Sequence, residues 1–146
     1  MFKHVLIPMD GSPVANRAAK AGIALARRLG AKATGYCAIE KLQPIYTEGY
    51  VFTVKEMGGF EKRAREAGHK RLGAIGKIAK AAGVPFTTLV GTAPNAFEGI
   101  IDAAKRRKCD VIFMASHGRR GLSRLLMGSV TQKVLSHTKI PVVVYQ

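Results

Sequence analysis

Several common protein classes are excluded by what this chain lacks. It has no tryptophan, two cysteines, and nine acidic residues against 24 Lys and Arg, which gives a formal net charge of +15. Cys37 and Cys109 form neither a C-x-x-C pair nor a metal-ligand spacing, so we expect buried free thiols and no disulfide framework. No apolar run approaches the ~20 residues of a membrane span. These absences favour a cytoplasmic globular protein.

The charge imbalance favours an anionic partner, whether a nucleotide, a nucleic acid or an acidic surface. The chain has no RNA-module signature and no aromatic residues interleaved with its basic stretches, so we expect no specific nucleic-acid binding and no membrane partner. The basic run 105–108 lies at the C-terminal end of a predicted helix, where cations interact favourably with the helix dipole. The chain also lacks a G-x-x-x-x-G-K-[ST] phosphate-binding loop, and this absence argues against efficient ATP hydrolysis.

Apolar runs alternate with helical patterns along the whole chain. Strands are predicted at 5–9, 33–39, 86–90, 111–115 and 142–145. Helices are predicted at about 13–29, 55–82, 95–107 and 129–137. Continuous apolar strands separated by helices are typical of an α/β fold, in which a parallel sheet is covered on both faces. The length fits one domain over residues 1–146.

Local signals mark the predicted helix starts and one helix face. Ser12 before Pro13 predicts an N-cap, and both Asn95 to Glu98 and Ser129 to Gln132 have capping-box spacing. Apolar residues at helical spacing indicate a core face in the second helix; they are Phe60, Ala64, Ala67, Leu72, Ile75 and Ala79. Glycines lower the intrinsic helix propensity of this segment, and Gly35 lowers the stability expected of the second strand.

Two loops stand out because of the residues they carry. Asp10-Gly11-Ser12 follows the first strand, and Ser116-His117-Gly118 follows the fourth. In open parallel sheets, ligands bind beyond the carboxyl ends of the strands, where the strand order reverses. From Ala115 to Ser129 the chain passes from a strand through a glycine-bearing loop to a helix N-terminus, which is a natural anion site.

Taken together, these segments resemble the universal stress protein family over essentially all 146 residues. The resemblance rests on VLIPMDGS (5–12), CDVI (109–112), Gly118 followed after nine residues by Gly128-Ser129, and IPVVV (140–144). It implies an adenine-nucleotide α-hydrolase-like sheet of five strands in order 3-2-1-4-5. It also implies a homodimer joined through the last strand, 142–145.

One branch of that family binds ATP and carries G-x-x-G, nine residues, then G-[ST]. The other branch lacks this signature and does not bind ATP. The chain matches the signature except that Ala115 replaces its first glycine, which places it in the ATP-binding branch. An alanine there is tolerated where φ is negative and damaging where φ must be positive.

The resemblance assigns roles to individual residues of a site for ATP or AMP. Pro8 and Met9 flank the base, and Asp10 lies near the ribose and any bound Mg²⁺. Ala38 offers backbone hydrogen bonds to adenine. The remaining expected contacts to ribose and phosphates come from Ala115, Gly118, Gly128, Ser129 and Val130.

Alternatives remain for several of these residues. Ser129 equally fits a helix cap, and Asp10 fits an Asx turn. Arg119, with Arg120 and Arg124, either closes over the phosphates or lies in a solvated loop. His117 either contacts the ribose or acts as an acid or base.

Three functions therefore follow from the sequence. The first is a stress-response regulator whose nucleotide state changes its surface or dimer, working with partner proteins the sequence does not name. The second is a slow Mg²⁺-dependent ATPase that uses His117 and Asp10. The third is a nucleotide-free interaction module in which Ala115 has disabled the site.

Overall fold

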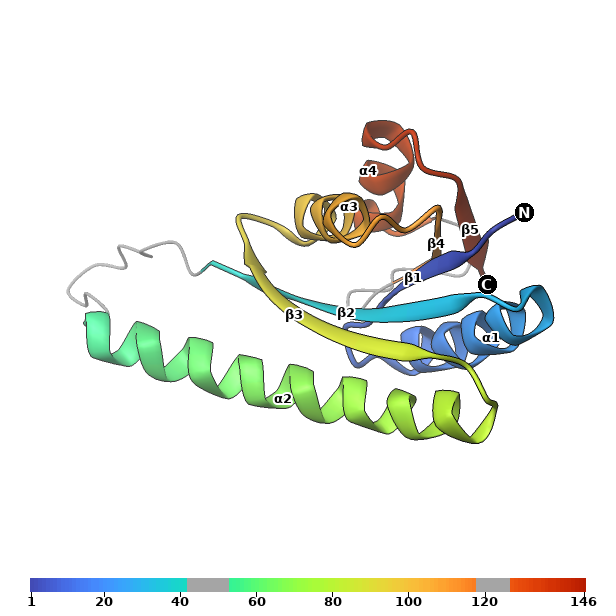
Figure 1. Ribbon diagram of the computed structural model, residues 1–146. Helices are drawn as coiled ribbons and strands as arrows, with labels where there is room; N and C mark the ends of the chain where they lie inside the picture. The colour runs from blue at the N-terminus through green and yellow to red at the C-terminus, as the bar shows by residue number, and fades with distance from the viewer. Residues whose placement is uncertain (42–52, 118–126) are drawn as a thin grey trace.

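A computed structural model of the chain describes residues 1–41, 53–117 and 127–146. Strands and helices alternate; they are β1 (His4–Pro8), α1 (Pro13–Leu29), β2 (Lys32–Glu40), α2 (Val54–Ala81), β3 (Phe86–Ala93), α3 (Ala96–Arg106), β4 (Val111–Ala115), α4 (Ser129–His137) and β5 (Val142–Tyr145). The five strands form one parallel sheet in order β3-β2-β1-β4-β5 (Figure 1). This confirms the predicted α/β fold and the strand order that the resemblance implied.

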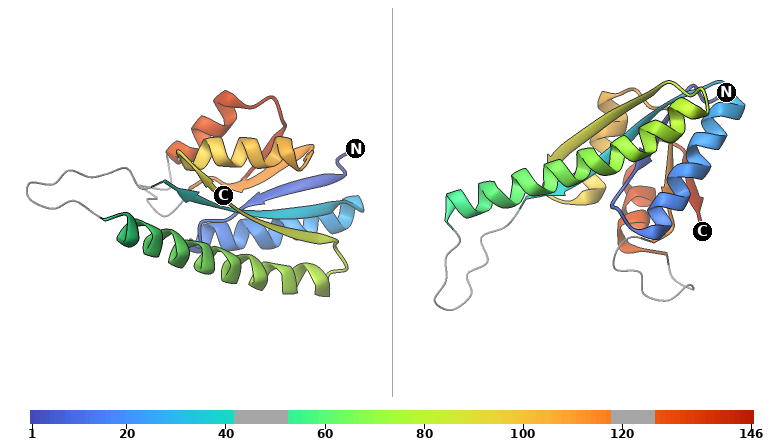
Figure 2. Two further views of the ribbon diagram at one scale, coloured as in Figure 1. Left: turned by 60° about the vertical axis from the view of Figure 1, so that its left-hand side comes forward. Right: turned by 90° about the horizontal axis from the view of Figure 1, so that it is seen from below.

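Helices cover both faces of the sheet. In Figure 2, α1 and α2 lie on one side and α3 and α4 on the other. Successive residues of the central strands alternate between the two cores: Val5 and Ile7 pack with α1 and α2, whereas Leu6 packs with α3 and α4. Cys37 and Cys109 are buried free thiols, as predicted, one in each core.

The second strand is not weakened by its glycine. β2 runs for nine residues, and a Cβ atom added to Gly35 would lie 2.6 Å from Phe86 Cζ and 2.8 Å from Leu72 Cδ2. Glycine within a strand marks a close approach of neighbouring groups. Gly35 therefore lets β3 and α2 pack against the middle of β2.

Helix α2 is longer than the sheet it covers. Leu72, Ile75 and Ala79 are buried as the stripe predicted. The prediction is wrong for the N-terminal half, because Phe60 is 45% exposed and Ala64 is exposed. This part of α2 extends past the strand ends (Figure 1). A capping box between Thr53 and Glu56, which the sequence analysis missed, fixes its start.

The helix caps agree with the sequence at two starts and differ at a third. Ser12 Oγ accepts the Ala15 N–H at 3.1 Å, and Asn95 Oδ1 accepts the Glu98 N–H at 3.1 Å. The predicted capping box from Ser129 to Gln132 is wrong. Gly128 is the N-cap of α4, no side chain caps this helix, and Ser129 is its first helical residue. The Gly128 N–H donates to the Ser116 carbonyl at 2.7 Å, which sets this register.

Along the described ranges, no helix combines the length and the apolar character needed to cross a bilayer. The predictions that involve Gly118, Arg119, Arg120 and Arg124 fall outside the described residues. β3 and β5 form the two edges of the sheet.

Candidate functional site

A cavity of about 1000 Å³ opens beyond the carboxyl ends of β1, β2 and β4. β1 pairs with β2 on one side and β4 on the other, so the strand order reverses between β1 and β4. This is the position where open α/β sheets bind ligands. Most of the predicted site residues line this switch-point cavity; they are Pro8, Met9, Asp10, Ala38, Ala115, His117, Ser129 and Val130.

The loop after β1 is organised by its own hydrogen bonds. Asp10 Oδ1 accepts the Ser12 N–H at 2.8 Å, and Ser12 in turn caps α1. Gly11 has φ +83°, a left-handed conformation that favours glycine. Asp10 thus forms the Asx turn that the sequence allowed while also lining the cavity. The structural and ligand-binding interpretations of Asp10 are compatible.

The end of β4 accommodates the alanine that departs from the signature. Among the described non-glycine residues, positive φ occurs at Lys108 and not at Ala115. Ala115 is extended strand backbone, and its carbonyl accepts the Thr131 hydroxyl at 2.9 Å. A Cβ atom at this position therefore causes no backbone strain.

The start of α4 differs from the other helix starts in the described chain. α1, α2 and α3 each have a side-chain cap, whereas α4 begins at a glycine without one. The first N–H groups of a helix lack intrahelical partners and carry the positive end of the dipole. Ser129, Val130 and Thr131 line the cavity from this first turn. The turn is therefore suited to an anion.

Gly128 itself contributes differently from what the resemblance implied. Its N–H is engaged with the Ser116 carbonyl, so in this structure it is not directed at a ligand. The bond instead ties the start of α4 to the end of β4. The next residues along the helix, Ser129, Val130 and Thr131, are those that line the cavity.

His117 has one ring nitrogen in a hydrogen bond and one without a partner. Its Nδ1 lies 2.8 Å from the Ser116 hydroxyl. Its Nε2 is buried and has no hydrogen-bond partner within the described structure. A buried polar atom left unpaired is costly, so a ligand atom in the cavity would stabilise it. Within the described residues the partner of Nδ1 is the Ser116 hydroxyl and not a carboxylate, which favours ligand contact over general-base catalysis.

The sequence analysis missed the cationic residues that line the cavity in the described chain, which are Lys41, Arg71 and Lys133. Arg71 lies on α2, and its guanidinium packs so closely on the β1 loop that a Cβ atom at Gly11 would collide with its Nε. Lys133 follows Ser129 by one helical turn, and its Nζ lies 5.5 Å from the Phe97 ring centroid. The spacing of Ser129 and Lys133 was readable as one helix face. Nothing local in the sequence indicates Arg71.

The overhanging half of α2 supplies a further wall of the cavity. Met57, Phe60 and Ala67 line it from this side. Arg65 fixes the wall to β3, since its guanidinium donates to the Thr92 hydroxyl at 3.1 Å and to the Val90 carbonyl at 3.3 Å. The sequence analysis assigned this stretch to the core and so missed the wall.

The residues present fit a metal ion only where phosphates carry most of its coordination. In the parts of the chain that the structure describes, no group of three or more His, Cys, Asp or Glu side chains could hold a metal. Asp10 is the acidic residue directly after β1 at the cavity. Mg²⁺ is commonly held by one or two carboxylates together with substrate phosphates. Asp10 suits that role when a nucleotide is bound.

Comparison with known proteins places this geometry in a family. The sequence profile of the Universal stress protein family matches residues 1–146. Universal stress protein MJ0531 of Methanocaldococcus jannaschii is 31% identical over 149 aligned residues, which cover 99% of this chain and 82% of that protein.

Solved structures show the same fold. The structure of the hypothetical protein MJ0577 superposes with a TM-score of 0.83 at 24% identity, over 99% of this chain and 95% of that one. A universal stress protein in complex with cAMP gives 0.74 at 18%, over 99% and 97%. One from Archaeoglobus fulgidus in complex with dAMP gives 0.61 at 16%, over 100% and 98%. With its full-length family match, this chain belongs to the universal stress protein family.

Proposed function

We propose that the chain is a stress-response regulator that binds an adenine nucleotide, ATP or AMP, in the switch-point cavity. The observation that carries the proposal is the uncapped first turn of α4, which borders the cavity together with Asp10 and the unpaired Nε2 of His117. The complexes of other family members with cAMP and dAMP support an adenine nucleotide as the ligand class.

The cavity walls suggest how each part of the nucleotide is held. Pro8, Met9 and Ala38 offer apolar surface and backbone groups for the base at the ends of β1 and β2. The first-turn amides of α4 face the phosphates, because they supply donors and the positive end of a dipole. Lys133 adds a cation one turn further along the same face.

The output we propose is a changed surface rather than a released product. His117 contacts a hydroxyl and not a carboxylate through Nδ1, so we expect hydrolysis to be slow at most. β5 is an edge strand with partly buried residues. Pairing of residues 142–145 with the same strand of a second copy would cover that edge by a two-fold contact. The Gly128 N–H donates to the Ser116 carbonyl, and the Ser116 N–H donates to the Tyr145 carbonyl of β5. Through these bonds a nucleotide at the start of α4 would alter the dimer.

Analysis of the bound nucleotide tests the proposal directly. The purified protein is denatured and any released nucleotide is identified, and ATP, AMP and inorganic triphosphate are then titrated into the stripped protein by calorimetry at moderate salt. We expect saturable one-to-one binding of an adenine nucleotide that exceeds the binding of triphosphate. Equal binding of triphosphate would mean that a basic surface attracts the phosphates and that no specific nucleotide site exists. No nucleotide and no binding would place the chain among nucleotide-free family members.

A further inference from the structure

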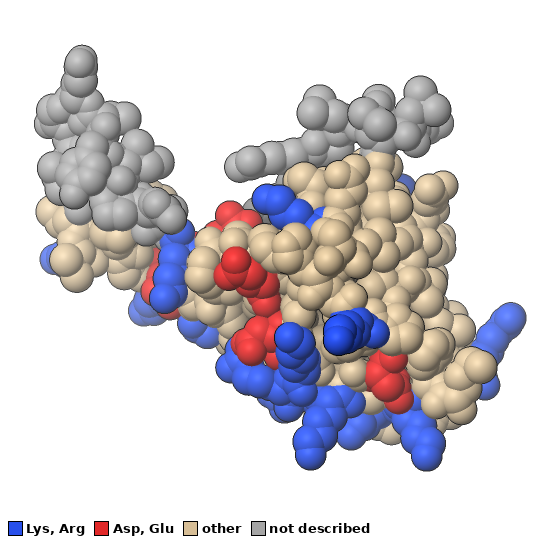
Figure 3. Space-filling view, turned by 90° about the horizontal axis from the view of Figure 1, so that it is seen from above, with Lys and Arg blue, Asp and Glu red and all other residues tan. Residues whose placement is uncertain are grey.

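The positive charge of the protein is concentrated in one of its two helical layers. α1 and α2 together carry twelve Lys and Arg against three Glu, whereas α3 and α4 carry three Lys and Arg against two acidic residues. The face formed by α3 and α4 shows acidic and basic side chains among uncharged ones (Figure 3). The imbalance is sharper still at one end, because the three Glu of α2 all lie at or before Glu66. α1 and the rest of α2 contain no acidic residue.

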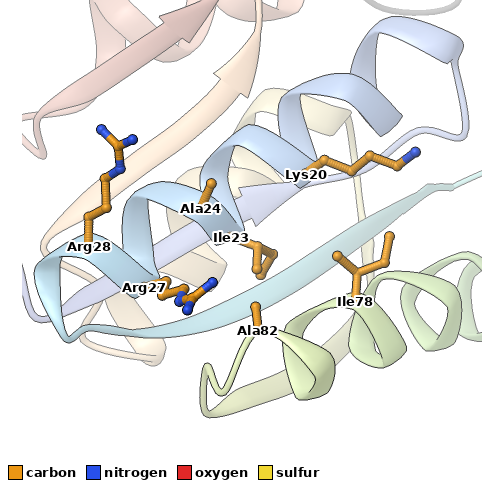
Figure 4. A pocket seen from close by; sticks show the side chains of 7 residues that line it. All are labelled: Lys20, Ile23, Ala24, Arg27, Arg28, Ile78 and Ala82. Carbon is orange, nitrogen blue, oxygen red and sulfur yellow. The ribbon is translucent and has the colours of Figure 1, made fainter.

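At that acid-free end, α1 and α2 enclose a groove of about 480 Å³, separate from the switch-point cavity. Its apolar floor is formed by Ile23 and Ala24 of α1 with Ile78 of α2 and Ala82 just after it. Cationic side chains of α1 flank this floor (Figure 4). Ile23 is 1% exposed, Ile78 and Ala82 are half-buried and Ala24 is exposed, so most of the floor can be reached by a ligand.

The cations around the groove follow helical spacing. Lys20 lies three residues before Ile23 and Arg27 four residues after it, so all three share one face of α1. The separation of seven positions between the two cations corresponds to about 10 Å along the helix. A complementary ligand therefore needs two negative charges about two helical turns apart, with an apolar group between them.

We propose that this α1–α2 groove docks an acidic amphipathic helix of a partner protein. An apolar side chain of the partner rests on the floor at Ile78 and Ala82, and carboxylates three residues before and four residues after it meet Lys20 and Arg27. This is the helix-in-groove mode of recognition, with charge complementarity fixing the register.

The groove fits this partner better than other polyanions. A nucleic-acid backbone would engage the cations but has no apolar group to bury on the floor. A flat bilayer surface would not fit into the groove between the two helices. An acidic helix satisfies the charges and the floor at once.

The test uses a designed peptide as the probe. A labelled helical peptide of about 15 residues carries Glu-x-x-Leu-x-x-x-Glu, and its matched control replaces the leucine by serine at the same charge. Binding is followed by fluorescence anisotropy at near-physiological salt, so that exposed long-range attraction is screened. We expect the serine peptide to bind at least about tenfold more weakly, because it cannot bury an apolar group.

Paired variants of the protein separate the groove from the general charge of the layer. The double variant Lys20→Glu with Arg27→Glu should bind the leucine peptide at least about tenfold more weakly. Lys55→Glu with Lys62→Glu makes the same charge change on the exposed face of the overhanging half of α2 and should weaken it less than about threefold. All four residues are exposed, and thermal unfolding confirms that both variants remain folded.

Three outcomes would overturn the proposal. Equal losses in the two paired variants, or equal binding of the leucine and serine peptides, would mean diffuse attraction with no docking site. Tighter binding of duplex RNA than of the peptide, lost in both variants, would identify a nucleic-acid surface instead. Preferential binding to vesicles of anionic phospholipid would identify a membrane surface. None of these results depends on nucleotide binding, since the groove and the switch-point cavity are distinct.

Discussion

The starts of α1 and α4 face the same cavity but are built in opposite ways. Each follows a strand, and the two strands, β1 and β4, are neighbours in the sheet. At the start of α1 the protein's own groups accept the backbone N–H bonds. Asp10 Oδ1 accepts the Ser12 N–H, Ser12 Oγ accepts the Ala15 N–H, and Pro13 has no N–H to donate. At α4 the cap is a glycine without a side chain. A helix start can thus be closed for the fold or left available for a ligand.

The energetic difference is modest for the fold and large for binding. A side-chain cap typically contributes about 1 kcal/mol to stability relative to alanine, but only a few tenths relative to glycine. The glycine start of α4 therefore costs the fold little, and it leaves the positive end of the helix dipole available to an anion. Changes at the two starts should therefore separate the free energy of unfolding from the affinity for the ligand.

Ser129→Asp should have opposite effects on the two quantities. A carboxylate in the first turn of α4 favours the helix dipole and should raise the free energy of unfolding by about 0.5 kcal/mol. The same carboxylate repels phosphate and should weaken ATP about 100-fold in calorimetry. Asn16→Asp, which adds the same charge near the start of α1, is the matched control and should leave affinity within about twofold. A similar loss of ATP affinity in both variants would mean that the starts of α1 and α4 do not differ in ligand binding.

Alkaline pH should weaken the layer that carries α4. Burial raises the pKa of the Cys109 thiol to about 11, and burial likewise raises the pKa of Tyr36 to about 12. Both residues lie in the core beneath α3 and α4. The folded state keeps protons that the unfolded chain releases, so this stability is complete below about pH 9 and is lost as pH rises through about 11.

For Cys109 the loss amounts to about 2 kcal/mol in urea denaturation compared across that range. Cys109→Ala should flatten the dependence on pH, at some cost in stability at every pH because a buried sulfur is removed. An unchanged slope in this variant would mean that another group governs the alkaline loss.

Arg71→Ala examines whether the closed start of α1 also contributes to binding. The guanidinium rests on the loop at Gly11 and lines the cavity. Removing this cation should weaken ATP about tenfold, as expected for loss of a charged contact to an anionic ligand. The neighbouring Lys70→Ala, at an exposed position, serves as control. Equal ATP affinities of the two variants would mean that Arg71 does not contact the ligand and that binding depends on the start of α4.

Ser12→Ala should act almost entirely on the fold. Without the hydroxyl, the Ala15 N–H loses its cap, and the free energy of unfolding should fall by about 1 kcal/mol in urea denaturation. ATP affinity should change less than about twofold, because the first-turn amides of α4 are untouched. A large loss of affinity with little loss of stability would assign Ser12 to the ligand instead.

Ala115→Gly should have the smallest effect. Ala115 already has strand geometry with no positive φ, so restoring the signature glycine relieves no strain. ATP affinity measured by calorimetry should stay within about twofold, and glycine in a strand should lower stability by about 0.5 kcal/mol. A tenfold gain in affinity would show that the alanine methyl obstructs the ligand.

The sequence predicted those features that depend on local patterns. Apolar strands, the Ser12 cap and the loops at Asp10 and His117 follow from residues near one another in the chain, and parallel topology then places the loops at one edge. The α4 cap was wrongly predicted because a bond from Gly128 to Ser116, across eleven intervening residues, sets its register. Arg71 was missed because its position depends on how α2 packs against the β1 loop.

The overhang of α2 has a consequence for how this protein can diverge. Residues such as Met57 and Phe60 shape the cavity yet lie beyond the strand ends, where no core depends on their size. Substitutions there can widen, narrow or recharge one side of the ligand space while leaving the sheet intact. Ligand preference is thus separated from foldability within a single helix, so that one half can vary while the other half is held constant by packing.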